Sequence, residues 1–220
     1  MAKESDLWIL TNKPLDRGFV EERLRAYRFE IEGYIRKERR FLTALKPLEV
    51  ELTAPKSVKE MSRCSKMANV GPMATVAGCI AQFLGHDLLK KGYKEVIVEN
   101  GGDIFLKILK KRLIGIYAGK SRVWNDLRLE INPKDTPLGL CTSSGTIGHS
   151  LSFGCADCVI ILSRNACLAD AVATATCNLV RTKQDLKKAL EYAQKIRGVL
   201  GVVIILKNTL ISWGKIRFAR

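Results

Sequence analysis

Asp170 and Thr174 are candidate metal ligands, because they place a carboxylate and a hydroxyl four residues apart in the stretch LADAVATAT. On a helix this spacing puts both oxygens on one face, a single turn apart. Such hard oxygen donors suit Mg²⁺, which keeps some of its water ligands and holds substrate phosphates. The alternative is that Asp170 offsets the helix dipole in a first turn while the alanines pack in a core. Spacing alone favours this alternative.

A second candidate is the polar segment 142–152, which combines six hydroxyl side chains with two glycines. Backbone N–H groups in such a loop can surround an anion, and the hydroxyls add donors for phosphate oxygens. A plain serine-rich connection is the alternative, but loops of this kind often carry sites, so we favour ligand binding. His149 is either a general base or a hydrogen-bonded loop residue, since no acidic residue adjoins it. The expected ligand-binding residues are Thr142, Ser143, Ser144, Gly145, Ser150 and Ser152.

The third candidate is the turn Asn100-Gly101-Gly102-Asp103, which lies between two apolar stretches. Asn-Gly strongly favours a type I′ hairpin, because both central residues of that turn need a positive φ. In the functional interpretation, the two glycines let the backbone approach a ligand while Asp103 offers a carboxylate. From the spacing alone, the two interpretations carry equal weight.

Cys155 and Cys158 form a C-x-x-C pair, a pattern that metal and redox sites use. A zinc or iron–sulfur centre usually needs a second ligand pair, and the other cysteines show no matching spacing. We therefore expect the cysteines to be reduced and to pack as small hydrophobic residues.

The composition limits the class of protein. Of the 220 residues, 47% are hydrophobic and 27% are charged, which excludes a disordered chain. The apolar stretches are too short to span a membrane and the N-terminus lacks the pattern of a signal peptide, so we expect a cytoplasmic protein. The formal net charge of +15 attracts anions, but the basic residues are spread along the chain. The basic segment 36–41 lacks interleaved aromatic residues, so nucleic-acid binding is the weakest hypothesis.

The length allows one large domain or two small ones. The hydrophobic periodicity predicts an α+β or mixed α/β architecture with a largely antiparallel sheet. Helices are expected within 16–45, 56–67, 72–91, 169–180 and 185–196. Strands are expected at 7–11, 95–99, 104–109, 113–117, 127–131, 138–142, 159–162, 199–206 and 210–213. Gly78 inside a predicted helix implies that another backbone or a ligand comes close to it. Apolar strands at the sheet edges permit a homodimer.

Together these segments resemble the ApbE superfamily, which includes FAD-dependent protein flavinyltransferases. The sequence is more similar to a shorter ApbE-like family of archaea and anaerobic bacteria. The similar segments cover nearly the whole chain: KESDL at 3–7, VGPMA at 70–74, VENGGD at 98–103, CTSSGT at 141–146, GHS at 148–150, SFG at 152–154, ADAVAT at 169–174 and WG at 213–214.

The resemblance implies a single ApbE-like α+β domain over residues 1–220, with a mostly antiparallel sheet packed with helices, in which Asp170 and Thr174 occupy the divalent-metal position. The glycine turn and the hydroxyl-rich segment would face the same cleft. The resemblance implies an Mg²⁺-dependent transferase that binds a small anionic ligand, with FAD or FMN as the candidate cofactor. His149, Asp103 and Asp157 would then be the candidate catalytic groups.

The sequence also departs from the flavinyltransferases. Residues 73–78 contain no lysine where those enzymes carry a Lys-Gly pair, and a His-Ile-Ile-Asp-Pro-like segment is absent. The alternative implied by the ApbE-like family is an accessory protein in sulfide assimilation and homocysteine formation, acting with a protein partner. Cys141 would then be a thiolate at the loop entrance, with a pKa lowered by nearby cations or N–H groups.

Overall fold

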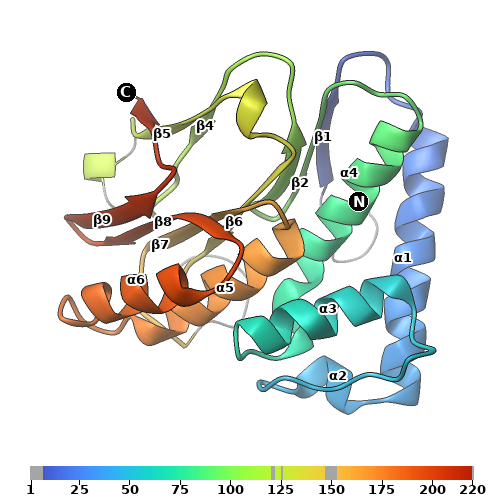
Figure 1. The fold of residues 1–220 in the computed structure, drawn as a ribbon, viewed down its shortest axis with the longest axis horizontal. Helices are drawn as coiled ribbons and strands as arrows, with labels where there is room; N and C mark the ends of the chain where they lie inside the picture. The colour runs from blue at the N-terminus through green and yellow to red at the C-terminus, as the bar shows by residue number, and fades with distance from the viewer. Residues whose placement is uncertain (1–6, 120–121, 125, 147–152, 220) are drawn as a thin grey trace.

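The computed structural model describes residues 7–119, 122–124, 126–146 and 153–219. A seven-stranded sheet forms its centre, and every neighbouring pair of strands is antiparallel (Figure 1). The predicted α+β class with a mostly antiparallel sheet is confirmed. In sheet order, the strands are β1 (Leu7–Thr11), β2 (Val96–Asn100), β3 (Asp103–Lys107), β6 (Leu138–Ser143), β7 (Cys158–Ser163), β8 (Val199–Leu206) and β9 (Thr209–Gly214).

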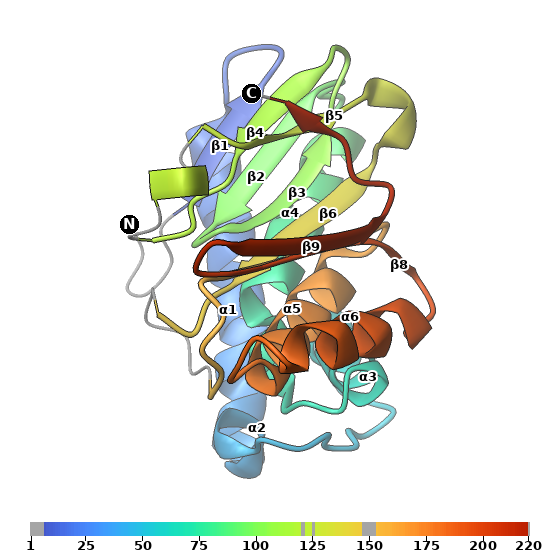
Figure 2. The ribbon, with the colours of Figure 1, turned by 90° about the vertical axis from the view of Figure 1, so that its left-hand side faces the viewer.

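Helices cover one face of this sheet (Figures 1 and 2). Two of them, α4 and α5, pack directly on the strands, so that Leu84 and Val172 share a buried cluster with Phe105 and Ile161. The helical elements are α1 (Arg17–Lys37), α2 (Arg40–Thr43), α3 (Lys56–Met67), the 3₁₀ turn η1 (Pro72–Thr75), α4 (Val76–Lys90), α5 (Ala166–Leu179) and α6 (Asp185–Lys195).

A smaller three-stranded sheet packs on the opposite face. Its strands, in order, are β10 (Phe218–Ala219), β5 (Arg128–Ile131) and β4 (Arg112–Gly115). Leu129 and Ile131 of β5 share a second buried cluster with Leu106 and Ile160 of the large sheet. Burial on both faces explains why the central strands are continuous apolar runs in the sequence. Two short 3₁₀ turns, η2 (Arg122–Trp124) and η3 (Pro133–Asp135), flank β5.

Helix α5 differs from the expected helix in its first residue. It begins at Ala166 and not at Ala169, and the Asn165 side chain caps it by accepting a hydrogen bond of 2.8 Å from the Leu168 N–H. Asp170 therefore lies beyond the first turn, which contains no acidic residue. The interpretation of Asp170 as a first-turn dipole partner is wrong, because that effect is confined to the terminal turn.

Within the described ranges, no single helix has the length and apolar composition needed to cross a membrane. The helix α3 and the segment Pro72–Lys90 meet the length and composition test together, as a pair bent by 100°.

Candidate functional site

The candidate site begins where α4 meets α5. The Gly78 N–H donates a hydrogen bond of 2.9 Å to Oδ2 of Asp170, and the Ala77 N–H donates to the same carboxylate. A Cβ on Gly78 would lie 2.5 Å from the Ala166 carbonyl oxygen and 2.8 Å from the Asp170 Cβ. The close approach expected at Gly78 is therefore made by another helix, and it directs the amides of the first turn of α4 at a carboxylate.

The glycine turn forms the second side of the site. Gly101 and Gly102 have φ angles of 61° and 97°, and Asn100 pairs with Asp103 across the turn between β2 and β3. The hairpin interpretation is confirmed. The buried Asn100 side chain also donates a hydrogen bond of 3.2 Å to the Ala77 carbonyl oxygen, which joins the hairpin to the start of α4.

Asp103 brings a second buried carboxylate to this region. Its Oδ1 accepts a hydrogen bond of 3.2 Å from the Thr142 N–H, which fixes the carboxylate against the end of β6. Burial raises the pKa of Asp103 to about 7, and the Glu99 carboxylate adds to that shift. Burial raises the pKa of Asp170 well above its usual range, and the Asp103 charge raises it further. The two carboxylates therefore act on each other.

The charge of this pair is not compensated by a cation among the described residues. Backbone N–H groups and the Cys141 thiol stabilise the two carboxylates, but no lysine or arginine lowers either pKa. Two buried like charges repel strongly unless a proton or a metal ion lies between them. The burial and mutual repulsion of the two carboxylates therefore favour binding of a proton or a cation.

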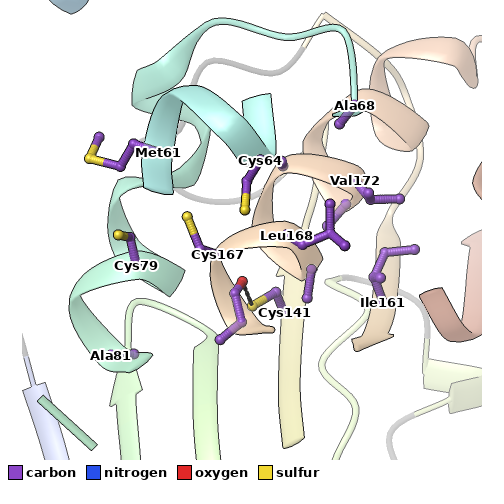
Figure 3. Close-up of a cluster of buried hydrophobic side chains, with 14 of the residues drawn as sticks. Met61, Cys64, Ala68, Cys79, Ala81, Cys141, Ile161, Cys167, Leu168 and Val172 are labelled. Atoms are coloured by element: carbon purple, nitrogen blue, oxygen red, sulfur yellow. Dashed lines mark hydrogen bonds between the residues drawn. The ribbon is translucent and has the colours of Figure 1, made fainter. Parts of the chain in front are cut away.

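Cys141 lies between two acceptors at the same place. Its Sγ is 3.2 Å from the Ala166 carbonyl oxygen (Figure 3), and it also hydrogen bonds to the Asp103 carboxylate. Its thiol is fully buried, and burial with the nearby Asp103 and Asp170 charges raises its pKa well above the usual range. The hypothesis of an activated thiolate at a loop entrance is wrong, because the charges beside Cys141 are negative and solvent does not reach it.

Thr174 lies one turn beyond Asp170 on α5 and is partly exposed. This position is consistent with a hydroxyl ligand beside the carboxylate, as the spacing predicted. Within the described ranges, the Thr174 hydroxyl makes no hydrogen bond to another residue of the candidate site. Its role as a metal ligand stays a prediction.

Several N–H groups of the hydroxyl-rich segment already have hydrogen-bond acceptors in the protein. Thr142 N–H is taken by Asp103, Gly145 N–H donates to the Ala156 carbonyl oxygen at 2.9 Å, and Thr146 N–H donates to Oγ of Ser144 at 3.1 Å. A Cβ on Gly145 would lie 2.0 Å from the Gly154 carbonyl oxygen, so this glycine permits close loop packing. Ser143 is buried. The predicted site residues His149, Ser150 and Ser152 lie outside the described residues.

Asp157 has a different environment from the carboxylate pair. Its carboxylate accepts hydrogen bonds from the Thr146 hydroxyl at 3.4 Å and from the Lys207 N–H in the turn between β8 and β9. Its own N–H donates to the Ile205 carbonyl oxygen at 2.9 Å. These contacts hold the end of the β6–β7 connection against that turn. In the described part of the chain, Asp157 is not hydrogen bonded to Asp103 or Asp170, so a catalytic role for it stays a prediction.

The C-x-x-C pair does not form a metal centre in the described residues. Cys155 is exposed, whereas Cys158 is buried on β7 among the residues that face the small sheet. The seven cysteines are free thiols. Among the described residues, no group of three or more His, Cys, Asp or Glu side chains could hold a metal ion. The expectation that these cysteines pack as small side chains is supported for Cys158.

Two features of the site were not predicted from the sequence. The amides of Ala77 and Gly78 bind Asp170, and the Asn100 side chain holds the Ala77 carbonyl. The only available signal was Gly78 inside a helix, which indicated a close approach without identifying what approaches.

Comparison with solved structures identifies the fold. The fold is like that of the flavin transferase ApbE from Vibrio cholerae, with a TM-score of 0.59 and 13% identity, covering 95% of this chain and 97% of that one. It is also like the Pseudomonas stutzeri flavinyl transferase ApbE, with a TM-score of 0.56 and 12% identity, covering 96% and 95%. The predicted ApbE-like fold is confirmed, and identities this low show the fold alone.

The sequence comparisons identify the family. Residues 1–218 match the family described as "AbpE bacteria", and the chain belongs to that family. A UPF0280 protein of Methanocaldococcus jannaschii is 41% identical over 209 residues, covering 91% of this chain and 84% of the relative. A UPF0280 protein of Methanococcus vannielii is 37% identical over 218 residues, covering 97% and 88%. The resemblance to an ApbE-like family with archaeal members is confirmed.

Proposed function

We propose that the chain binds a divalent cation, Mg²⁺ in the simplest case, between Asp103 and Asp170, and through it an anionic phosphorylated ligand. The observation that carries this proposal is the buried carboxylate pair, whose charge no described cation compensates. A cation there would replace the proton that the raised pKa values otherwise favour. Carboxylate oxygens are the ligands that Mg²⁺ prefers, and one or two of them are sufficient when water and phosphate complete its coordination.

The residues around the pair fit such a cation. Asp103 and Asp170 would supply carboxylate oxygens, and the Thr174 hydroxyl would be a further hard donor one turn along α5. When bound, the cation would neutralise phosphate charge during a transfer step. The amides of Ala77 and Gly78 and the side chain of Asn100 would keep the carboxylates in place, because each fixes one element relative to another.

The ligand follows from the same charges. Without a cation, a phosphate would approach two carboxylates and be repelled, so phosphate binding should depend on the metal. The ApbE-like fold supports a flavin nucleotide as the phosphorylated ligand and a transferase as the class of enzyme. Residues 73–78 lack the lysine that the resemblance to flavinyltransferases leads us to expect, so ATP is tested beside FAD and FMN.

Calorimetry on the full chain tests the proposal. We expect Mg²⁺ and Mn²⁺ to bind with a stoichiometry of one at pH 8, and at least one of FAD, FMN and ATP to bind only when the metal is present. Asp170→Asn and Asp103→Asn should each abolish metal binding, whereas Glu191→Gln, an exposed carboxylate on α6, should not. Metal binding that survives both site substitutions, or phosphate binding that is unchanged in EDTA, would contradict the proposal.

A further inference from the structure

Three cysteines from three helices lie close together in the helical layer. Their spacing in the sequence matches no metal-binding or redox motif. They are Cys64 of α3, Cys79 of α4 and Cys167 of α5, and all three are fully buried free thiols. Figure 3 shows the Cys64 and Cys167 sulfur atoms next to each other, with the Cys79 side chain on the other side of Cys167. Hydrogen bonds link Cys167 to both of the other thiols.

We propose that Cys64 and Cys167 are a thiol pair that a small-molecule disulfide converts into an intramolecular disulfide. In the first step Cys64 loses its proton, its sulfur attacks one sulfur of the oxidant, and one small thiolate leaves. In the second step Cys167 loses its proton, attacks the Cys64 sulfur and releases the second small thiolate, and both thiolates take up the protons. The protein gives up two electrons and two protons, and the oxidant becomes two thiols.

The surroundings of Cys64 make it the sulfur that reacts first. Its Sγ lies 3.4 Å from Nη2 of Arg63 and 3.4 Å from Oε1 of Glu60. The Arg63 side chain is 50% exposed, so a single layer of side chain separates this sulfur from solvent. Cys167 lies deeper, among α3, α4 and α5. The order of attack follows from this difference in depth.

Cys79 is the competing partner for Cys167. Its Sγ lies 3.7 Å from the Ser57 carbonyl oxygen, which gives its proton an acceptor away from the other thiols. Cys64 and Cys79 are both thiol neighbours of Cys167, but Cys64 is the one that lies under the half-exposed Arg63 side chain. The oxidant should therefore reach Cys64 before Cys79, and the bridge should join α3 to α5 and not α4 to α5. The hydrogen bond with Cys167 raises the pKa of Cys64, and burial and the Glu60 charge raise it further, so the reaction is slow and requires local opening at Arg63.

Mass spectrometry of the folded full chain tests the pair. The reduced protein is incubated with 2-hydroxyethyl disulfide, the remaining thiols are alkylated at low pH, and the protein is digested without reductant. We expect the dominant linked peptides to contain Cys64 and Cys167, and the thermal midpoint of the protein to shift upward and return when reductant is added. The upward shift is expected because the bridge restricts the unfolded chain.

The variants separate this bridge from other reactions. Cys64→Ser and Cys167→Ser should each lose the linked peptides and the thermal shift, whereas Cys79→Ser and the exposed Cys155→Ser should retain both. Cys64→Ala replaces Cys64→Ser if the serine variant does not fold. The proposal is overturned if the folded wild-type protein forms only a mixed disulfide at Cys155, or if the linked peptides contain Cys79 instead. It is also overturned if the Cys64–Cys167 bridge forms only in urea. None of these thiols is a proposed cation ligand, so failure here leaves the proposed function standing.

Discussion

The Gly78 N–H and the Asp170 carboxylate, 92 residues apart in sequence, are joined by a hydrogen bond of 2.9 Å that brings the start of α4 against the middle of α5. The bond forms because Gly78 lacks a side chain and the helices can approach closely. It places a carboxylate in the core beside Asp103, where a negative charge is costly without a compensating cation. The contact therefore connects the packing of two helices with the chemistry of the candidate site.

Gly78→Ala should destabilise the protein by about 3 kcal/mol or more, since the new Cβ would lie 2.5 Å from the Ala166 backbone oxygen. Urea unfolding measures the change. The matched control is Gly33→Ala on α1, where a Cβ would meet only the far end of the Arg36 side chain at 3.7 Å. That substitution should stabilise the helix by up to about 1 kcal/mol. If both substitutions change the free energy of unfolding equally, then helix propensity and not close packing determines the effect of Gly78→Ala.

Asp103 should make the protein less stable as pH rises. Its pKa is raised from 3.8 to about 7 on folding, so the folded state holds a proton that the unfolded state has lost. The stability contribution of this group is complete below pH 3.8 and is lost as pH rises through 7. Urea unfolding between pH 4 and pH 8 should show a smaller decline in Asp103→Asn than in the wild type. An identical pH profile for the two proteins would argue against this charged pair.

Asn100→Ala should cost about 1–3 kcal/mol, because it leaves the Ala77 carbonyl without its side-chain donor in a buried region. It should also weaken Mn²⁺ binding, since the hairpin that carries Asp103 would lose its tie to α4. Asn132→Ala is the control, because that amide contacts Glu130 near the surface. If Asn100→Ala lowers stability but leaves the calorimetric metal affinity unchanged, the hairpin holds Asp103 without this bond.

Asp157→Ala should separate loop packing from metal binding. The substitution removes the acceptor of the Thr146 hydroxyl and the Lys207 N–H, at a cost of about 1–3 kcal/mol. Metal affinity should stay within about twofold of the wild type, a difference well below 1.4 kcal/mol in binding free energy. A loss of metal binding as complete as in Asp170→Asn would instead assign Asp157 to the cation site.

Local signals predicted most of the sheet because its central strands are apolar runs bounded by polar segments. Gly101 and Gly102 are the clearest example, since the backbone conformation they favour is the one observed. The predicted start of α5 is wrong because the Asn165 cap lies before the alanine-rich stretch that indicates a helix in the sequence.

The candidate site was only partly predictable. Residue types indicated Asp103 and Asp170 separately, but their shared effect on pKa depends on β3 and α5 lying side by side in the core. The same limitation applied to Cys141, which looked accessible from its place beside a polar segment and is fully buried. These groups are buried by helices that are far from them in the sequence, so no local sequence pattern predicts their burial.

The order of strands has a consequence for how the chain folds during synthesis. From β2 onward, each strand of the large sheet joins its neighbour in the order of translation, while β1 pairs with β2 only after α1 to α4 have been made. Closing that first pair bridges a long segment and costs chain entropy before later contacts repay it. The ribosome-bound chain should therefore hold β1 without a partner until Asn100 has left the exit tunnel, and the β1–β2 pair should form more slowly than the β2–β3 hairpin, whose strands are joined by two residues.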